Sequence, residues 1–271
     1  MKKIILFLVL ILSIGLVYGD SATMSVTVGS AGPSVDSVSV ADADPTSGST
    51  TEITITSQIT DTNGVDDINL VKVEFTVGTP ANGNTIEANM TDSCTNVDSD
   101  TIECVTTYDM QFYDPAQTYT IQVTAEDAGA ATHAITDDFA YSALVALELD
   151  ATALDFGSVQ VGAPDTIPGD EDMGTGGAPT IKNQGNAVID AAISATDFIG
   201  PTDSFGAEEA DSQFGALGWV ALSNGGRTET GLDLATGASS LENVDFRLTI
   251  PVGALPETYS STVTITAVTN S

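Results

Sequence analysis

Apolar and polar side chains alternate along most of the chain in short segments that end at Gly, Asp, Asn or Pro. Alternation with a period of two is typical of β-strands that bury one face. In the first half such segments lie at residues 23–28, 35–40, 51–60, 70–77, 101–108, 119–125 and 134–141. Short strands at this spacing predict a β-sandwich.

A second series of strand-like segments begins after residue 143. Its members lie at residues 144–149, 151–161, 180–183, 187–194, 218–222, 244–250 and 259–268. Each series has enough residues for a hydrophobic core of its own. We therefore predict an all-β protein of two tandem Ig-like or Greek-key β-sandwiches, at residues 34–142 and 143–271.

Each predicted sandwich has a tyrosine that follows a proline turn at the start of a late strand. Pro115 precedes Tyr119, and Pro256 precedes Tyr259. In Greek-key sandwiches a tyrosine at this position donates its hydroxyl group to backbone a few residues upstream. We expect both tyrosines to stabilise the fold rather than to contact a ligand.

The first nineteen residues have a different pattern. Lys2 and Lys3 precede an apolar run at residues 4–17, which closes on Gly19. The run would span only about 21 Å as a helix, less than the roughly 30 Å of a bilayer core, so residues 1–19 predict a cleavable secretory signal. An uncleaved anchor is the alternative. We expect a secreted protein, extracellular or at the cell surface, without membrane contact after cleavage.

Charge and composition exclude several classes of function. The chain has 38 acidic residues against 6 Lys and Arg, a formal net charge of −32. Nucleic acids and anionic membrane surfaces need clustered cations, which are absent here. One histidine and two cysteines exclude most zinc, haem and iron–sulfur sites. No nucleophile motif accompanies His133, so we do not expect an enzyme.

One acidic loop is a candidate metal site. It holds four side chains with oxygen ligands, Asp61, Asn63, Asp66 and Asp67. It is not an EF-hand, because Lys72 stands where the twelfth-position Glu is required. In a sandwich, the loop between strands 51–60 and 70–77 shares a pole with the loop between strands 119–125 and 134–141, which carries Glu126 and Asp127.

Five carboxylates at one pole would repel each other unless a cation or bulk water screened them. Ca²⁺ prefers six to eight oxygen ligands. The sequence therefore predicts a calcium site, with the candidate ligands Asp61, Asn63, Asp66, Asp67, Glu126 and Asp127. A solvated Asp-rich turn is the alternative, because Asn63 and Gly64 alone favour a turn.

Two covalent features are expected of an exported chain. Cys94 and Cys104 flank a short polar loop and predict a disulfide, with two free thiols in a reducing environment as the alternative. Asn89 begins the sequon Asn-Met-Thr and is a candidate glycosylation site.

Residues 20–33 form a predicted N-terminal strand arm. Met24, Val26 and Val28 alternate with Thr and Ser, and a Gly- and Pro-containing joint follows. An isolated strand is unstable, so this one must add to a sheet edge. Addition to a neighbouring copy is donor-strand complementation, which ties subunits head to tail into an open filament. The alternative is an extra edge strand in its own chain.

Short sequence phrases resemble known surface modules. The first half, with Val-Ala-Asp-Ala-Asp-Pro-Thr-Ser-Gly-Ser at 40–49 and Asp-Thr-Asn-Gly-Val-Asp-Asp-Ile-Asn at 61–69, resembles immunoglobulin- or cadherin-like modules of archaeal and bacterial surface proteins. The second half, with Leu-Asp-Phe-Gly-Ser-Val at 154–159 and the closing segment 259–267, is similar to secreted sandwich domains of fibre-forming proteins, including the camelysin-like biofilm fibre group.

The resemblance implies an extracellular structural or adhesive role without catalytic residues. We therefore expect a structural subunit of a filament or surface layer that binds other copies of itself, and other surface proteins or glycans as further partners. The alternative is a monomeric calcium-dependent adhesin or carbohydrate-binding module that uses Trp219 or the segment 203–214. Because acidic loops gather at the poles of the sandwiches, assembly should depend on divalent ions or on salt.

Overall fold

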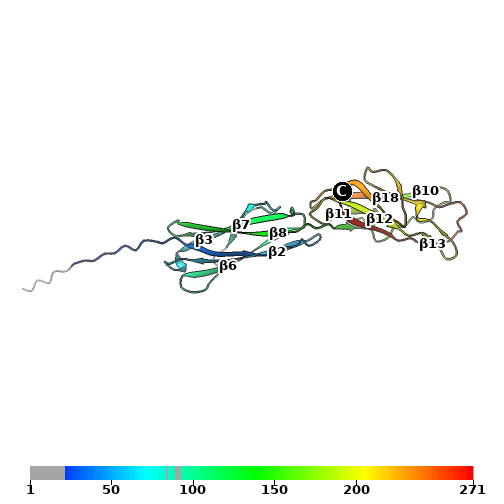
Figure 1. Cartoon of the computed structure of the whole chain (residues 1–271). Helices are drawn as coiled ribbons and strands as arrows, with labels where there is room; N and C mark the ends of the chain where they lie inside the picture. Colours follow the sequence, from blue (N-terminus) through cyan, green and yellow to red (C-terminus); the bar gives the residue numbers. More distant parts are fainter. Residues whose placement is uncertain (1–21, 84, 89–92, 271) are drawn as a thin grey trace, which may run out of the picture. The chain divides into compact units, whose positions relative to one another are not determined.

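A computed structural model describes residues 22–83, 85–88 and 93–270. Its regular structure is almost entirely β, which confirms the all-β prediction (Figure 1). Residues up to Ser30 and residues from Ala31 onwards are two separate units, and each is described by itself. The predicted signal at residues 1–19 and the sequon at Asn89 lie outside the described residues.

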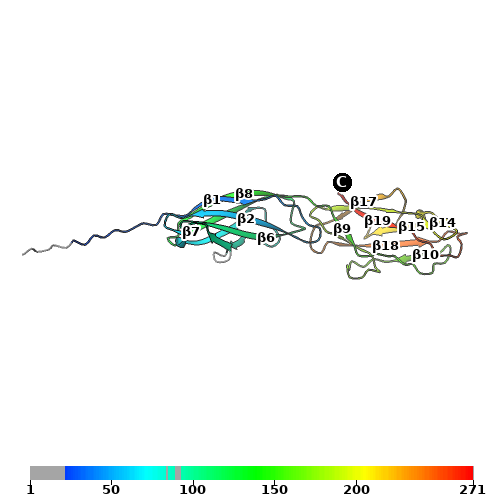
Figure 2. The same ribbon diagram turned by 90° about the horizontal axis from the view of Figure 1, so that it is seen from below.

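The first sandwich packs two four-stranded antiparallel sheets face to face (Figures 1 and 2). One sheet has the order β1-β2-β6-β5, with β1 at Ser34–Val40, β2 at Thr50–Thr60, β5 at Cys94–Asn96 and β6 at Thr101–Gln111. The other has the order β4-β3-β7-β8, with β3 at Ile68–Val77, β4 at Thr85–Ala88, β7 at Gln117–Asp127 and β8 at Thr132–Tyr141.

Alternation along β7 shows how this core forms. Its inward side chains are all fully buried: Tyr119, Ile121, Val123 and Ala125. The Tyr119 ring stacks on Phe139, with the ring centroids 5.4 Å apart. The Tyr119 hydroxyl donates to the Pro115 carbonyl at 2.9 Å, which confirms the predicted tyrosine corner.

The second sandwich has a larger and a smaller sheet (Figure 2). The larger has the order β16-β15-β18-β11-β9, at Val220–Ala221, Ala210–Phe214, Leu241–Thr249, Thr180–Asn183 and Leu147–Leu149, and β10 at Pro164–Ile167 also pairs with β18. The smaller has the order β17-β12-β19, at Arg227–Leu234, Ile189–Ala195 and Val263–Thr269. A separate two-stranded hairpin of β13 at Phe198–Ile199 and β14 at Ser204–Phe205 completes the second sandwich.

Ile181, Ile189 and Val244 lie at the centre of the second core and are fully buried. The Tyr259 hydroxyl donates to the Leu255 carbonyl at 3.0 Å, so the second predicted tyrosine corner is also confirmed. The residues on each side of position 143 thus hold one hydrophobic core each.

Two predicted strands, 23–28 and 151–161, are not strands in the structure. Alternation shows that a segment can present one apolar face, but it does not supply a neighbouring strand to pair with. Conversely, β4, β5, β10, β13, β14, β15 and β17 were not predicted. Most of these strands are too short to show a period. In β17 most residues are polar, so its apolar positions give no clear alternation.

The helical elements in the part of the chain that the structure describes are short 3₁₀ turns. The turns are η1 at Val65–Asp67 and η2 at Ala207–Glu209. Neither they nor any other described helix has the length and apolar character needed to cross a bilayer.

Candidate metal centre

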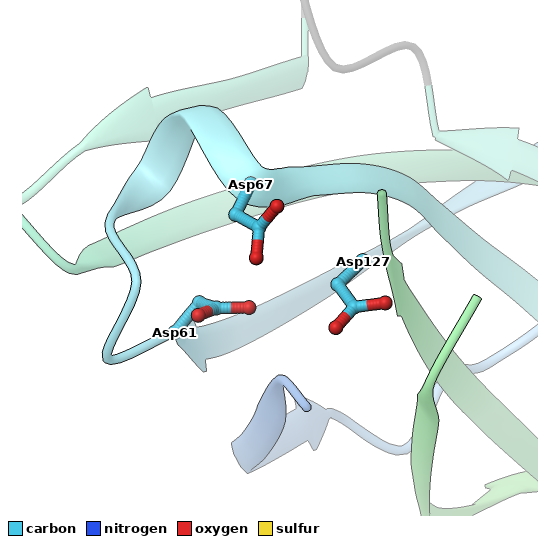
Figure 3. A group of neighbouring side chains, drawn as sticks. All are labelled: Asp61, Asp67 and Asp127. Atoms are coloured by element: carbon cyan, nitrogen blue, oxygen red, sulfur yellow. The ribbon is translucent and has the colours of Figure 1, made fainter. Parts of the chain in front are cut away.

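Three aspartates meet at one end of the first sandwich. Asp61 follows β2 directly, Asp67 closes η1 just before β3, and Asp127 is the last residue of β7. One carboxylate oxygen of each lies within 4.8 Å of one oxygen of each of the others. Figure 3 shows the three carboxylates around a common space. We call these three side chains the acidic centre.

Local hydrogen bonds hold the loop that carries Asp61 and Asp67. Asp61 Oδ1 accepts a hydrogen bond from the Asn63 amide at 2.8 Å, a typical Asx turn. Gly64 follows with a φ of 105°, a backbone conformation that a side chain would strain. The Ala128 amide donates to the Asp67 carbonyl at 2.8 Å and so joins this loop to the one after β7.

The acidic centre is a buried concentration of negative charge. Asp61 and Asp127 are 0% and 1% exposed, and Asp67 is half-buried. Asp127 Oδ1 accepts a hydrogen bond from the Ala131 amide at 2.7 Å. Asp61 Oδ2, by contrast, is buried and accepts no hydrogen bond from the described residues. A buried carboxylate oxygen without a partner is costly, and a positively charged ligand shared with Asp67 and Asp127 would satisfy it.

A hard divalent cation fits this arrangement. Two oxygens that bind the same Ca²⁺ at about 2.4 Å lie at most about 4.8 Å apart, and the three carboxylates meet that limit. The donors are all carboxylate oxygens, which suit calcium or magnesium better than softer metals. Three protein oxygens leave further positions for water, as hard cations accept.

The other predicted ligands lie elsewhere. Asn63 Oδ1 accepts a hydrogen bond from the Ala31 amide at 2.6 Å. Asp66 is exposed on η1. Glu126 is adjacent to Asp127 in β7, and neighbouring residues of a strand point to opposite faces of the sheet. The structure therefore brings together Asp61, Asp67 and Asp127 but not the whole predicted set.

The loop before β6 contributes a support that sequence reasoning missed. The Asp61 amide donates to the Asp100 carbonyl at 2.7 Å, and the Val65 amide donates to the Ser99 carbonyl at 3.1 Å. Hydrogen bonds with Asp100 lower the pKa of the Asp98 carboxyl, and the same contact raises the pKa of Asp100. The acidic turn at residues 98–100 was the sequence signal available for this support. Only the fold, however, places that turn beside Asp61.

The hydrogen bond from Ala31 to Asn63 also connects the acidic loop to the chain segment that precedes β1. In the same region the Val35 amide donates to His133 Nδ1 at 2.9 Å. The loop that carries Asp61 and Asp67 therefore helps to fix the first residues of the first sandwich.

The predicted disulfide is confirmed. Cys94 and Cys104 are joined, and they face each other on the paired strands β5 and β6. The bond ties the three-residue β5 to the centre of its sheet.

The described part of the arm, residues 22–29, forms no strand. The side chains of Met24, Val26 and Val28 are 95%, 87% and 78% exposed.

No protein-family model matches the chain, and no curated protein matches it. Solved structures show low similarity. Latent PorU of Porphyromonas gingivalis gives a TM-score of 0.32 at 11% identity over 92% of this chain and 20% of that one. The chain thus spans about a fifth of PorU.

Two pilus complexes are also similar. A chaperone–tip adhesin complex of CFA/I fimbriae gives a TM-score of 0.32 at 9% identity, over 89% of this chain and 85% of that one. The CsuC–CsuE chaperone–tip adhesion subunit complex of Acinetobacter baumannii gives 0.35 at 9% identity, over 85% and 100%. At such TM-scores these similarities carry no argument about function.

Proposed function

We propose that the protein is a secreted structural subunit of an extracellular filament or surface layer and that it assembles head to tail through its N-terminal arm. The observation that carries this proposal is the arm itself. Residues 22–29 form no strand and expose three alternately spaced apolar side chains. Residues 21–35 are also uncharged in a chain with a net charge of −32.

An exposed segment of this kind gains stability by joining a sheet. Burying a Val or Met side chain contributes about 1.5–3 kcal/mol, partly offset by the entropy lost on ordering the backbone. Main-chain hydrogen bonds to a sheet edge fix the pairing, and alternate side chains enter pockets beside that edge. Because the donor and the acceptor are different surfaces, the contact repeats into an open chain of subunits.

A divalent cation in the acidic centre supports this assembly in two ways. It would neutralise the buried Asp61 carboxylate and so stabilise the loop that binds the Ala31 backbone, at the root of the arm. It would also reduce the repulsion between the acidic ends of neighbouring subunits. Asp61, Asp67 and Asp127 are the residues that would hold the ion.

The competing proposal is a monomeric calcium-dependent adhesin or carbohydrate binder, which the same acidic centre would support. For this competing proposal, Trp219 was the candidate residue for contact with a sugar. The Arg247 guanidinium group lies over the Trp219 ring, 4.6 Å from its centroid, and also binds Asp211 at 2.8 Å. One face of the indole is thus already occupied, which favours the assembly proposal.

Negative-stain microscopy and light scattering of the exported chain test the proposal. We expect filaments or sheets in calcium, and monomers when residues 20–29 are deleted. None of the arm residues belongs to either hydrophobic core, so the deletion should leave both melting transitions in place. A full-length chain that stays monomeric in calcium at high concentration would refute the assembly proposal and leave the adhesin.

A further inference from the structure

The second sandwich contains an open groove whose lining is as much polar as apolar. Its volume is about 1050 Å³, and it lies among the segments 149–161 and 254–263 and the inner faces of the larger sheet. Its apolar lining includes Leu149, Phe156, Phe246, Leu248, Tyr259 and Val263. The charged side chains in the lining are Asp155 and Glu257, and Glu257 already accepts hydrogen bonds from Thr202 and Asp203.

Strand β19 begins at the groove, where its first residue Val263 is part of the lining, and the strand has one free edge in the described structure. It pairs with β12 alone. At the two ends of this ladder, the Thr196 amide donates a hydrogen bond to the Thr262 carbonyl, and the Asn270 amide donates one to the Val188 carbonyl. Hydrogen-bonded and non-hydrogen-bonded pairs alternate along an antiparallel ladder. The amides of Val263, Ile265 and Ala267 therefore point away from β12, toward the free edge.

The inward side chains of β19 also lack full cover. Val263, Ile265 and Ala267 are half-buried, and so are Leu154 and Phe156 across the groove. Apolar core positions that stay half-exposed on one strand are what a sandwich lacking a strand would show.

The lack of charged residues distinguishes β19 from the other sheet edges. Edge strands are commonly protected from pairing by charges, prolines or short length. The edge strand β19, Val-Thr-Ile-Thr-Ala-Val-Thr, has none of these, and no charged residue occurs from Thr258 to Asn270. Every other edge strand of the two described sandwiches carries a charged residue or is at most three residues long.

We propose that residues 23–28 of one copy pair with the free edge of β19 in the next copy, with Met24, Val26 and Val28 covering the half-buried side chains of Val263, Ile265 and Ala267. The inference rests on the proposed assembly function and names its acceptor. Donor and acceptor match in three respects: both are strand-like, both are uncharged, and the alternate apolar side chains of one meet half-buried apolar side chains of the other. The lack of acidic residues matters most, since a negatively charged strand would be repelled by so acidic a protein.

Chain length favours a second copy over the same chain. Met24 is ten residues before Ser34. Even in a fully extended chain, Met24 therefore lies at most about 34 Å from Ser34. Strand β1 starts at Ser34 opposite Thr60, whereas the chain leaves the first sandwich after Tyr141, at the other end. Strand β8 alone has ten residues and spans about 34 Å. The apolar arm residues therefore do not extend past their own first sandwich.

Hydrogen exchange of individual amides tests the acceptor. The protein lacking residues 20–29 is mixed with a synthetic peptide of residues 20–30. We expect the amides of Val263, Ile265 and Ala267 to exchange at least about tenfold more slowly, because they gain ladder hydrogen bonds. The amides of Thr264 and Thr266 already face β12 and should change little. A peptide with Val26→Asp should give no protection.

The full chain provides a matched pair of variants. Val26→Asn places an uncharged polar side chain on the apolar face of the arm and should abolish assembly, whereas Thr27→Asn places the same side chain on the opposite face and should retain it. Equal loss in both variants would refute the predicted arm orientation.

The failure of this inference is distinguishable from the failure of the proposed function. If the full chain assembles and arm deletion prevents it, but protection appears at another sheet edge, the acceptor is wrong and the function stands. If the peptide protects no edge and the full chain stays monomeric, both are wrong. Protection of β19 with a full chain that stays monomeric would overturn the assembly function and retain the binding edge.

Discussion

The two sandwiches are built from the same kind of alternating sequence, but they close to different degrees. In β7 the inward Ile121 and Val123 are fully buried, and the strand has a neighbour on each edge. In β19 the inward Val263 and Ile265 remain half-buried, and the described structure gives that strand one neighbour. Alternation determines which side chains face inward, whereas the number of neighbouring strands determines how fully they are buried.

Each sandwich also has its own unmet requirement. Both sandwiches bury aspartate oxygens that no described residue bonds, but among the described residues only the first gathers three carboxylates, Asp61, Asp67 and Asp127, which one cation would satisfy. The second leaves the inward side chains of an unprotected edge strand half-buried, which an added strand would cover. We therefore expect the stability of the first sandwich to depend on divalent ions, and the covering of the β19 edge by a second copy to depend on protein concentration.

Truncating the matched isoleucines is the strongest test of this difference. Ile121→Ala should lower the free energy of unfolding of the first sandwich by about 2–5 kcal/mol, because it opens a cavity in a closed core. Ile265→Ala should cost less than about 2 kcal/mol in the monomer, because its side chain is half-exposed. Denaturant unfolding checks both, with Trp219 fluorescence reporting on the second sandwich alone. Equal costs would show that β19 is as closed as β7.

Calcium should stabilise the first sandwich and leave the second unchanged. At a hundred times the dissociation constant the gain is about 2.7 kcal/mol, seen as a higher melting temperature than in chelator. Asp61→Asn should remove this gain. Asp66→Asn makes the same charge change on an exposed neighbour outside the acidic centre and should keep the gain. A melting temperature indifferent to calcium in the unmodified protein would refute the metal centre.

Alkaline pH should weaken the first sandwich more than the second. Desolvation raises the pKa of Tyr108 to about 12, and burial also raises the pKa of Tyr119 and Tyr141. A raised pKa in the folded state contributes stability below the unfolded value near 10, and this stability is lost as pH rises from about 10 toward 12. The second sandwich has Tyr259 alone with such a shift.

Calorimetric scans across this pH range check the difference between the sandwiches. Tyr108→Phe removes one titrating group and should flatten part of the decline in the first transition. Parallel decline of both transitions would contradict the assignment.

The sequence predicted the parts that depend on local pattern. Alternation located β1, β2, β3, β6, β7 and β8, and the proline–tyrosine spacing located both tyrosine corners. The acidic centre was predicted in part: the shared pole brings Asp127 to Asp61, but η1 turns Asp67 inward and leaves Asp66 exposed. Such orientation depends on the loop backbone, which the residue types alone do not specify.

The groove could not be predicted from the sequence either, because it too depends on how the backbone is arranged in the folded sandwich. Segment 151–161 has the alternation of a strand and was expected to be one, yet it lines the groove without forming a ladder. Whether a segment pairs depends on which edge lies within hydrogen-bonding distance, a property of the folded sandwich. The free edge of β19 is therefore a structural finding.

Ala267→Pro should have the smallest effect on the monomer and still separate the two sandwiches. Its amide faces the free edge rather than β12, so proline there removes no bond to β12 and should change monomer stability by less than about 1 kcal/mol. Assembly should nevertheless be lost, because the arm loses a ladder hydrogen bond and meets the proline ring. In the first sandwich Val123 pairs with strands on both sides, so Val123→Pro must unfold it. Light scattering and melting curves of the two variants measure both effects, and undiminished assembly of Ala267→Pro would exclude β19 as the acceptor edge.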